Sequence, residues 1–338
     1  MKYQNILQNG KVQCTICPRN CILPEGQEGF CHVRKNKNGE IVLTTYGFNT
    51  GLAIDPIEKK PLYQFYPTSG VLSFGTLGCN MGCLFCQNWH ISKSKADVSS
   101  LNKNTPQEIV EIAKQYNCKS VAFTYNDPII FFEYAIDTAK LCQTQGIKTV
   151  AVTSGFINPE PAKEFFQYMD AANIDLKGFS EEFYKKNCLA KLQPVLDTIE
   201  YVVKETPCHV ELTTLLIEGE NDYDEMIKNE CEWIITHLGD SIPLHFSAFF
   251  PQYKFDKRSA TKFETLLRAY DIAKEVGLKY VYTGNLTNTE TSTTYCRNCN
   301  EAVILRNGYH LLEYNIDKYG RCKFCQVPVD GVYEKAYK

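Results

Sequence analysis

The sequence predicts an α/β protein built as a partial or open (β/α)6 TIM-like barrel, with an N-terminal cysteine-rich module and a C-terminal zinc-ribbon-like module. Within residues 70–284, short β-branched runs alternate with helical patterns, and these runs are apolar on both faces. Such strands indicate a parallel sheet covered by helices. Clustered cysteines in residues 1–69 and 285–338 predict the two flanking modules. A doubly wound sheet is the alternative.

Each expected strand is rich in β-branched or aromatic residues and is bounded by glycine or polar residues. The expected strands are residues 70–78, 119–127, 148–155, 171–179, 208–217, 242–249 and 278–284. Helices are expected between them, and the first has Thr105 as N-cap, Pro106 at its first position and Glu108 three residues after the cap. The expected helices are residues 105–116, 128–146, 159–169, 192–205, 222–239 and a segment within 259–276.

Polar and thiol side chains recur where the expected strands end. In a barrel of parallel strands, the loops that follow the strands carry the chemistry. The candidates are Cys79–Cys86, Tyr125-Asn126-Asp127, Thr153-Ser154-Gly155, Asp175, Lys177, Glu211, Thr213 and His245. Taken singly, Thr213 and Ser247 are interpreted as buried polar groups that have hydrogen-bond partners. The set as a whole predicts a functional site at this end of the barrel.

The charged stretch DPIEKKP precedes the first expected strand of the barrel. Two interpretations of it stay open. It is a solvated loop, or Glu58, Lys59 and Lys60 contribute to the mouth of the barrel.

Composition argues against several classes of protein. The chain has 36 Lys and Arg against 39 Asp and Glu, a net charge of −3, so no basic field predicts a nucleic-acid partner. No apolar run approaches the roughly 18 residues of a membrane span. The first residues lack the long apolar stretch of a signal peptide. We therefore expect a cytoplasmic protein with no membrane and no nucleic-acid partner.

Sixteen cysteines are unusual for a chain of 338 residues. A long chain that is not exported does not need disulfides, so clustered thiols predict metal sites. Five solitary cysteines are interpreted as small buried hydrophobic residues. These five are Cys118, Cys142, Cys188, Cys208 and Cys231.

Cys79, Cys83 and Cys86 form a group of three within a glycine-rich loop. A cubane of four irons ordinarily takes four thiolates, so three thiolates leave one iron open to a chelating ligand. The amino and carboxylate groups of an amino acid are such a ligand. The alternative is a zinc ion held by the three thiolates and a remote histidine, either His90 or His32.

Two further groups each contain four cysteines. The C-terminal group has two C-x2-C pairs separated by 22 residues (300–321), which is typical of a structural zinc ribbon, with an electron-relaying cluster as the alternative. It consists of Cys296, Cys299, Cys322 and Cys325. The spacing of the N-terminal group accommodates zinc or a further iron–sulfur cluster. It consists of Cys14, Cys17, Cys21 and Cys31.

The motif CNMGCLFC, with Phe85 before its last cysteine, resembles the radical S-adenosylmethionine (SAM) superfamily. Similar stretches are DPIEKKPL (55–62), FTYNDP (123–128), NIDLKGF (173–179) and PLHFSAFFP (243–251). In these stretches the chain resembles the radical SAM enzymes of the AmmeMemoRadiSam system, which are relatives of pyruvate formate-lyase-activating enzyme. The resemblance covers nearly the whole chain, including both cysteine-rich flanks.

This resemblance implies that the three cysteines of the motif ligate a 4Fe–4S cluster and that SAM chelates the unique iron. It also implies a set of SAM-contacting residues, with Asp127 where many relatives have Glu and Ser154 where a Thr-Asn-Gly element has its amide. Asp175 and Lys177 match a motif near the SAM carboxylate, and His245 matches a histidine near the adenosine. The implied contacts are Phe85, Asn126, Asp127, Ser154, Asp175, Lys177 and His245.

The implied activity is reductive cleavage of SAM to methionine and a 5′-deoxyadenosyl radical, which abstracts hydrogen from a substrate. Similarity to glycyl-radical activases suggests a glycine of a partner protein as that substrate. Radical modification of a small molecule is one alternative, and a non-catalytic zinc-binding scaffold or an electron-transfer protein are others. The implied partners are an electron donor, such as a flavodoxin or ferredoxin, and Memo-like or Amme-type proteins.

Overall fold

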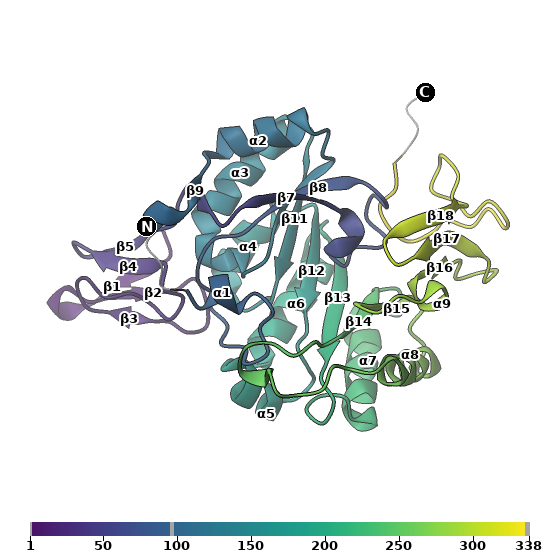
Figure 1. Cartoon of the computed structure of the whole chain (residues 1–338). Helices are drawn as coiled ribbons and strands as arrows, with labels where there is room; N and C mark the ends of the chain where they lie inside the picture. The colour runs from purple at the N-terminus through teal and green to yellow at the C-terminus, as the bar shows by residue number, and fades with distance from the viewer. Residues whose placement is uncertain (1, 95–97, 335–338) are drawn as a thin grey trace.

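A computed structural model of the chain describes residues 2–94 and 98–334, and it confirms an open α/β barrel (Figure 1). Eight strands form one sheet in the order β15-β14-β13-β12-β11-β10-β8-β7, so β15 and β7 are its two edges. Seven of these strands, all except β7, run parallel to one another. They are β8 (Gly70–Phe74), β10 (Ser120–Phe123), β11 (Lys148–Thr153), β12 (Ala171–Asp175), β13 (His209–Leu216), β14 (Leu244–Ala248) and β15 (Val281–Gly284).

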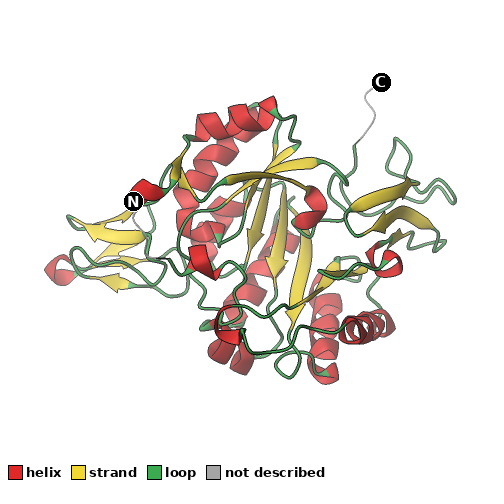
Figure 2. Ribbon diagram, viewed as in Figure 1, coloured by secondary structure: helices red, strands yellow, loops and turns green. Residues whose placement is uncertain are grey.

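Six longer helices lie along the outer face of the sheet (Figure 2). They are α2 (Pro106–Gln115), α3 (Phe132–Thr144), α4 (Pro159–Phe166), α6 (Gln193–Glu205), α7 (Asp224–Leu238) and α8 (Phe263–Val276). The predicted capping box at the start of α2 is present, because Thr105 accepts a hydrogen bond from the N–H of Glu108 and donates its own N–H to the Glu108 carboxylate. Within the described ranges, no helix is both long and apolar enough to cross a membrane.

Shorter elements lie in the connections. They are η2 (Ile57–Lys59), α1 (Trp89–Ser92), η3 (Val98–Ser100), η4 (Pro128–Phe131), α5 (Glu181–Phe183), the π-helical turn η5 (Tyr184–Cys188), η6 (Tyr253–Phe255) and α9 (Thr289–Ser292).

Small antiparallel sheets flank the barrel on opposite sides in Figure 1. The N-terminal elements are β1 (Gln4–Ile6), η1 (Gln8–Gly10), β2 (Val12–Cys14), β3 (Ile22–Leu23), β4 (Arg34–Lys37), β5 (Glu40–Leu43) and β6 (Phe48–Asn49), which pairs with β9 (Asn102–Lys103). The C-terminal sheet contains β16 (Thr294–Tyr295), β17 (Ala302–Asn307) and β18 (His310–Tyr314). Strand β7 (Leu52–Pro56) pairs antiparallel with β8, so the large sheet begins inside the segment 1–69 that we assigned to the N-terminal module.

The inner face of the sheet is closed at the amino ends of its strands by the segment 57–69. Ile57, Leu62 and Phe65 of this segment pack against inward-facing residues such as Ala122 and Val150. Because this irregular segment takes the place that a second layer of helices would fill, the architecture is an open barrel and not a doubly wound sheet. Its opposite end, at the carboxyl ends of the strands, is left for the functional site.

Glu211 of β13 fixes the closing segment to the sheet. Its buried carboxylate accepts hydrogen bonds from the backbone N–H groups of Tyr63, at 3.0 Å, and Gln64, at 2.7 Å. It also contacts His245 at 2.6 Å and His209 at 3.0 Å. Burial acts to raise the pKa of Glu211, but the hydrogen bonds from the two histidines outweigh it and lower that pKa to about 2.

Arg306 attaches the C-terminal module to the same segment. Its guanidinium is fully buried, donates hydrogen bonds to the Tyr63 carbonyl and the Thr294 hydroxyl, and lies 3.6 Å from the Glu58 carboxylate. Glu58 also accepts a hydrogen bond of 2.8 Å from the N–H of Thr68. Glu58 therefore has a structural role between the module and the barrel.

A buried carboxyl group behind β13 predicts a pH-dependent stability. Glu230 of α7 is 1% exposed and forms a hydrogen bond with the Thr214 hydroxyl. This hydroxyl also contacts the carbonyl of Leu176, which directly follows β12. Burial raises the pKa of Glu230 to about 8. The folded state therefore keeps a proton that the unfolded chain loses near pH 4.5, and stability falls as the pH rises from about 5 to 8.

We expect Glu230→Gln to remove this loss, which is on the order of 3 kcal/mol over that pH range. Anaerobic urea denaturation at pH 5 and pH 8 measures it. Glu232→Gln, on the exposed side of the same helix, is the matched control and should leave the pH dependence unchanged. If the free energy of unfolding fell equally between pH 5 and pH 8 in Glu230→Gln and in the wild-type protein, the raised pKa of Glu230 would be contradicted.

Candidate active site

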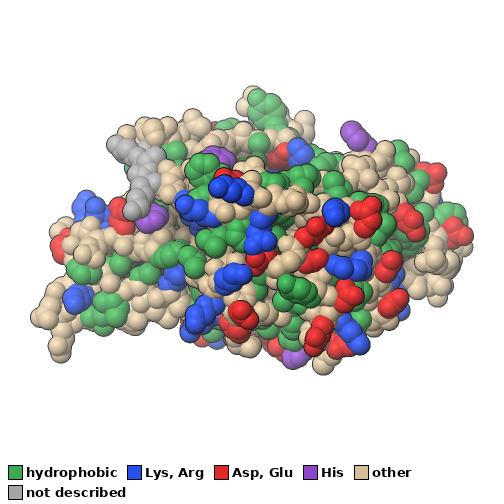
Figure 3. Space-filling view, turned by 60° about the horizontal axis from the view of Figure 1, so that its bottom comes forward, with side chains coloured by type: hydrophobic (Ala, Val, Ile, Leu, Met, Phe, Trp, Pro, Cys, Tyr) green, Lys and Arg blue, Asp and Glu red, His purple; other side chains and the backbone are tan. Residues whose placement is uncertain are grey.

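A cavity of about 310 Å³ opens at the carboxyl ends of the parallel strands. Figure 3 brings this end of the molecule toward the viewer and shows both signs of charge interspersed over the face. The three cysteines of the central motif line the cavity, and so do six of the seven residues expected to contact SAM. These six are Phe85, Asn126, Asp127, Ser154, Asp175 and Lys177.

The loop that carries the three cysteines leaves β8 and is held by backbone groups from a distant segment. The N–H of Gly82 donates to the Cys188 carbonyl at 2.8 Å, and the N–H of Leu84 donates to the Asn187 carbonyl at 2.9 Å. Both acceptors belong to the π-helical turn η5, which ends at Leu189 with φ 49°. A Cβ at position 82 would lie 2.7 Å from the Leu189 side chain, so this contact requires glycine.

Asn126 holds the first part of the same loop. Its amide NH2 donates to the Gly78 carbonyl at 2.8 Å and to the Leu77 carbonyl at 3.3 Å, and its amide oxygen accepts from the N–H of Thr76 at 3.1 Å. The polar atoms of Asn126 are thus bonded to the loop backbone. The structure gives Asn126 a positioning role beside the three thiols.

The three central thiols are not gathered as closely as the four thiols of the C-terminal group. Across residues 2–94 and 98–334, only the C-terminal group brings three or more metal-ligating atoms within 4.8 Å of one another, and His90 and His32 do not complete such a set with the central thiols. Thiolates around one zinc ion lie about 3.8 Å apart, because Zn–S bonds are about 2.3 Å long and tetrahedral. Wider spacing suits a cubane, in which each thiolate binds its own iron.

Burial affects the protonation of these thiols. It raises the pKa of Cys79 to about 12 and also raises the pKa of Cys86. A hydrogen bond with the buried thiol of Cys188 lowers the pKa of Cys83 to about 7. Cys188, which we expected to be a solitary hydrophobic residue, therefore lies directly beside a residue of the central group. Its neighbour is far away in the sequence, so no local pattern indicates this contact.

Asp175 and Lys177 form an ion pair of 2.6 Å at the end of β12. Burial acts to lower the pKa of Lys177, but the Asp175 carboxylate and the Cys83 thiol outweigh it, and the net effect is a raised pKa. The backbone around Lys177 is fixed by the Tyr184 hydroxyl, at 3.0 Å, and the Asn221 amide, at 2.8 Å. The cavity thus presents one anionic and one cationic group side by side, next to the thiols.

Asp127 and Ser154, the two departures from the superfamily pattern, are bonded to each other. The Asp127 carboxylate accepts hydrogen bonds from the Ser154 hydroxyl and from the Ser154 N–H at 3.0 Å. It also accepts from the Thr153 hydroxyl at 2.9 Å and the N–H of Ile129 at 3.1 Å. Burial raises the pKa of Asp127. The hydrogen bonds between Asp127 and Ser154 therefore connect the loop after β10 to the loop after β11.

Thr213 corrects one of our expectations. We expected its hydroxyl to be satisfied, but it is buried, faces the cavity and has no hydrogen-bond partner among the described residues. A buried hydroxyl without a partner costs about 1–3 kcal/mol, so this group is available to a polar ligand in the cavity. Ser247 lines the cavity beside it.

Lys59 and Lys60 line the mouth of the cavity, which confirms for these two residues the interpretation that the DPIEKKP stretch contributes to it. Lys60 is nearly buried and pairs with Asp55 at 2.8 Å. Asp55 also accepts a hydrogen bond from the Tyr125 hydroxyl at 3.2 Å. Tyr125 has φ 70°, a left-handed conformation that is uncommon for a bulky residue and is often found at functional sites.

His245 is the one expected SAM contact that the structure does not bring into the cavity lining. It lies beneath the cavity, where it forms a hydrogen bond with Glu211. Its ring packs edge-on against the Tyr63 ring, with 4.8 Å between the ring centres. The motif that contains His245 is a short stretch of sequence that includes β14. The Glu211 carboxylate that binds His245 comes from the neighbouring strand β13. Sequence spacing alone does not reveal this pairing.

The C-terminal four-cysteine group is arranged as a compact metal site. The Sγ atoms of Cys296 and Cys325 are 3.6 Å apart, and those of Cys299 and Cys322 are 3.7 Å apart. All four lie within 4.8 Å of one another. These separations match four thiolates around one ion, so this group could bind a metal.

Comparison with known proteins agrees with this geometry. Residues 74–231 match the family described as the radical SAM superfamily. An uncharacterized protein, MJ0808, of Methanocaldococcus jannaschii is 43% identical over 96% of this chain and 97% of its own length. Pyruvate formate-lyase 1-activating enzyme of Escherichia coli K12 is 22% identical over 61% of this chain and 89% of its own length.

Among solved structures, a radical SAM methyltransferase from Sphaerobacter thermophilus is similar in fold, with a TM-score of 0.51 and 16% identity. The match covers 66% of this chain and 68% of the methyltransferase chain. The chain therefore belongs to the radical SAM superfamily and is an enzyme. Membership implies a 4Fe–4S cluster and SAM. The three thiols that line one cavity, the Asp175–Lys177 pair and the Thr213 hydroxyl, which has no partner among the described residues, fit these two groups.

Proposed function

We propose that this enzyme uses its cluster and SAM to abstract a hydrogen atom from a glycine of a partner protein at the mouth of the cavity. The observation that supports this most is that the three thiols and the Asp175–Lys177 pair line one cavity. When bound, the reduced cluster supplies one electron that cleaves SAM to methionine and a 5′-deoxyadenosyl radical.

The charged pair suits the amino-acid end of SAM. That end is a zwitterion, so Lys177 complements its carboxylate and Asp175 complements its ammonium group. The Thr213 hydroxyl, which lacks a partner in the described part of the chain, is available to a polar group of the same ligand. Phe85 forms an apolar wall between the thiols and the Phe183 and Phe255 rings.

The closed end of the barrel protects a reactive intermediate from water. The Glu211 carboxylate binds the closing segment, and apolar residues of that segment fill the space beneath the cavity. A radical formed above this layer meets solvent only through the mouth, which a bound substrate covers.

Similarity to pyruvate formate-lyase 1-activating enzyme supports a protein glycine as the substrate. The partners that we propose are a one-electron donor such as a flavodoxin or ferredoxin, and Memo-like or Amme-type proteins. We place the reaction in the cytoplasm, because clustered thiols that bind metals suit a reducing compartment. We assign zinc to the compact C-terminal group and zinc or a second iron–sulfur cluster to the N-terminal group.

Replacing Lys177 should weaken SAM binding. We expect Lys177→Met to raise the Kd for SAM by roughly tenfold or more, because it removes a partly buried cation from the cavity and leaves Asp175 unpaired. Equilibrium binding to the anaerobic, cluster-loaded protein measures this. Lys186→Met, an exposed lysine paired with Glu220 outside the cavity, is the control and should bind SAM as the wild type does. Equal affinities for both variants would remove Lys177 from the SAM site.

The proposed reaction is tested by following deuterium. The reconstituted enzyme is reduced with dithionite in the presence of SAM and a candidate substrate, and 5′-deoxyadenosine is examined by mass spectrometry. A partner protein with deuterated glycine should transfer deuterium into 5′-deoxyadenosine and acquire a glycyl radical signal in electron paramagnetic resonance (EPR). Transfer from a deuterated small molecule instead would overturn the protein substrate, and absence of 5′-deoxyadenosine under all conditions would overturn SAM cleavage.

A further inference from the structure

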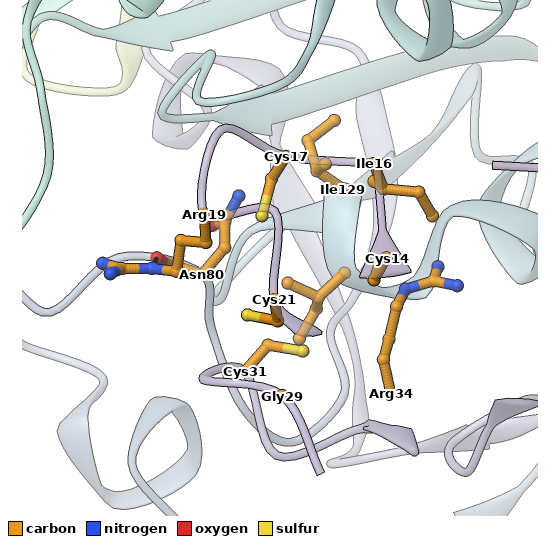
Figure 4. Close-up of a pocket in the computed structure, with 11 residues that line it drawn as sticks. Cys14, Ile16, Cys17, Arg19, Cys21, Gly29, Cys31, Arg34, Asn80 and Ile129 are labelled. Carbon is orange, nitrogen blue, oxygen red and sulfur yellow. Dashed lines mark hydrogen bonds between the residues drawn. The ribbon is translucent and has the colours of Figure 1, made fainter. Parts of the chain in front are cut away.

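The N-terminal four-cysteine group lies against the loop that carries the three central thiols. Figure 4 shows Cys14, Cys17, Cys21 and Cys31 around a hollow that Asn80 also lines. Asn80 directly follows Cys79 in the chain, and its side chain donates to the Phe156 carbonyl at 2.8 Å. Asn80 therefore belongs to the loop of the central thiols and also lines the hollow of the N-terminal group.

The spacing of the N-terminal thiols differs from that of the C-terminal group. In the described part of the chain, no three N-terminal thiols lie within 4.8 Å of one another, although all four line the same hollow. The C-terminal thiols are spaced for one zinc ion, with Sγ separations of 3.6 Å and 3.7 Å. The N-terminal thiols resemble the central group instead, since neither forms the compact set that one zinc ion requires, and the thiolates of a cubane bind separate irons.

Two arginines flank the N-terminal group on opposite sides in Figure 4. Arg34 is 2% exposed and forms an ion pair of 2.7 Å with Glu133. Arg19 donates to the carbonyls of Asn80 and Leu189, and its guanidinium lies 3.4 Å from the centre of the Phe30 ring. Partly buried cations beside four thiolates stabilise the additional negative charge that a cluster gains on reduction.

The backbones of the two groups are in direct contact. A Cβ on Gly78, which has φ +80°, would lie 1.9 Å from the Cys31 carbonyl oxygen, so only glycine allows this approach. Cys79 is the next residue, with its Cα about 3.8 Å from that of Gly78. Cys31 thus contacts Gly78, the residue directly before Cys79. Metals held by the two groups would therefore be on the order of 10 Å apart.

We propose that Cys14, Cys17, Cys21 and Cys31 bind a second 4Fe–4S cluster, which passes electrons one at a time to the cluster held by Cys79, Cys83 and Cys86. This inference rests on the proposed function. One electron enters from a reduced flavin or iron–sulfur protein, which is oxidised by one electron. The N-terminal cluster is reduced and then reoxidised, and the same electron reduces the central cluster. Zinc, which has no redox chemistry, does not serve this purpose.

The experiment uses the full chain, purified and reconstituted anaerobically. We expect about eight irons and one zinc per wild-type chain, and two magnetically coupled EPR signals after reduction, of which SAM changes one. Cys17→Ala/Cys21→Ala should keep about four irons, lose the coupling and retain the SAM-sensitive signal. Its rate of SAM cleavage with reduced flavodoxin, relative to that with dithionite, should fall roughly tenfold or more. Cys118→Ala/Cys142→Ala, which removes two solitary buried thiols, is the matched control and should resemble the wild type.

Four irons with two zincs in the wild-type chain, or two clusters without magnetic coupling, would overturn the relay. If the double variant does not fold, the metal content and the coupling of the wild-type protein decide the question. The proposed function fails in a different way, when no EPR signal responds to SAM and no 5′-deoxyadenosine forms. The iron count still reports on the second cluster in that case.

Discussion

Cys79→Ala should abolish formation of 5′-deoxyadenosine from SAM, with a loss of about a thousandfold or more, because the reaction has no other source of electrons at the sulfonium. Cys79 is one of the three thiols of the loop that follows β8, and Asn126 and Gly82 hold this loop in place. Chromatographic quantitation of 5′-deoxyadenosine after dithionite reduction measures the effect.

The matched control is Cys118→Ala, which removes a buried thiol before β10 and away from the cavity lining. It should retain wild-type turnover, iron content and EPR spectrum. Cys79→Ala should lose the signal that responds to SAM while it keeps a folded far-ultraviolet circular dichroism spectrum. Wild-type turnover by Cys79→Ala would contradict cluster ligation by the central motif.

Arg306→Ala should lower the free energy of unfolding by about 3–5 kcal/mol, the usual cost of removing one partner from a buried ion pair. The fully buried guanidinium contacts Glu58, the Tyr63 carbonyl and the Thr294 hydroxyl. Its loss leaves the buried Glu58 carboxylate without a cation and removes one hydrogen bond from the Tyr63 carbonyl. Chemical denaturation of the anaerobic full-length protein measures the change.

Arg268→Ala provides the comparison on the surface. Arg268 is about half exposed and pairs with Asp222 at 2.9 Å, so its removal should cost about 0–1 kcal/mol. In Arg306→Ala, a second substitution Glu58→Leu should restore part of the lost stability, because it removes the unpaired charge. A loss below 1 kcal/mol for Arg306→Ala would show that the C-terminal module is not fixed through this pair.

The parallel strands could be predicted because their signals are local. Each is a short run rich in β-branched or aromatic residues and bounded by glycine or polar residues, and Thr105 and Glu108 mark the start of helix α2 in the same local way. Strand β7 could not be predicted by this criterion, since its residues are half-buried or exposed and lack an apolar face. Its place in the sheet depends on pairing with β8, which only the folded chain reveals.

The cysteine spacing predicted the nature of the site, but not the division of roles among its polar residues. Asp127 and Ser154 both follow strands, and nothing in the sequence indicates that they bond to each other. The same is true of His245 and Glu211, which belong to neighbouring strands. The Thr213 hydroxyl is distinguished by having no partner among the residues that the structure describes, and this property depends on three-dimensional packing.

The close approach of Gly78 to the Cys31 carbonyl has a consequence for the biogenesis of the enzyme. The two loops are in direct contact at this point. Arg19 of the N-terminal segment also donates hydrogen bonds to the carbonyls of Asn80 and Leu189. Each loop therefore depends on the other for its final shape, and the three-thiol loop is complete only when the N-terminal segment is folded against it. Ribosomal synthesis delivers the N-terminal segment first, so this segment is already made when the three-thiol loop emerges.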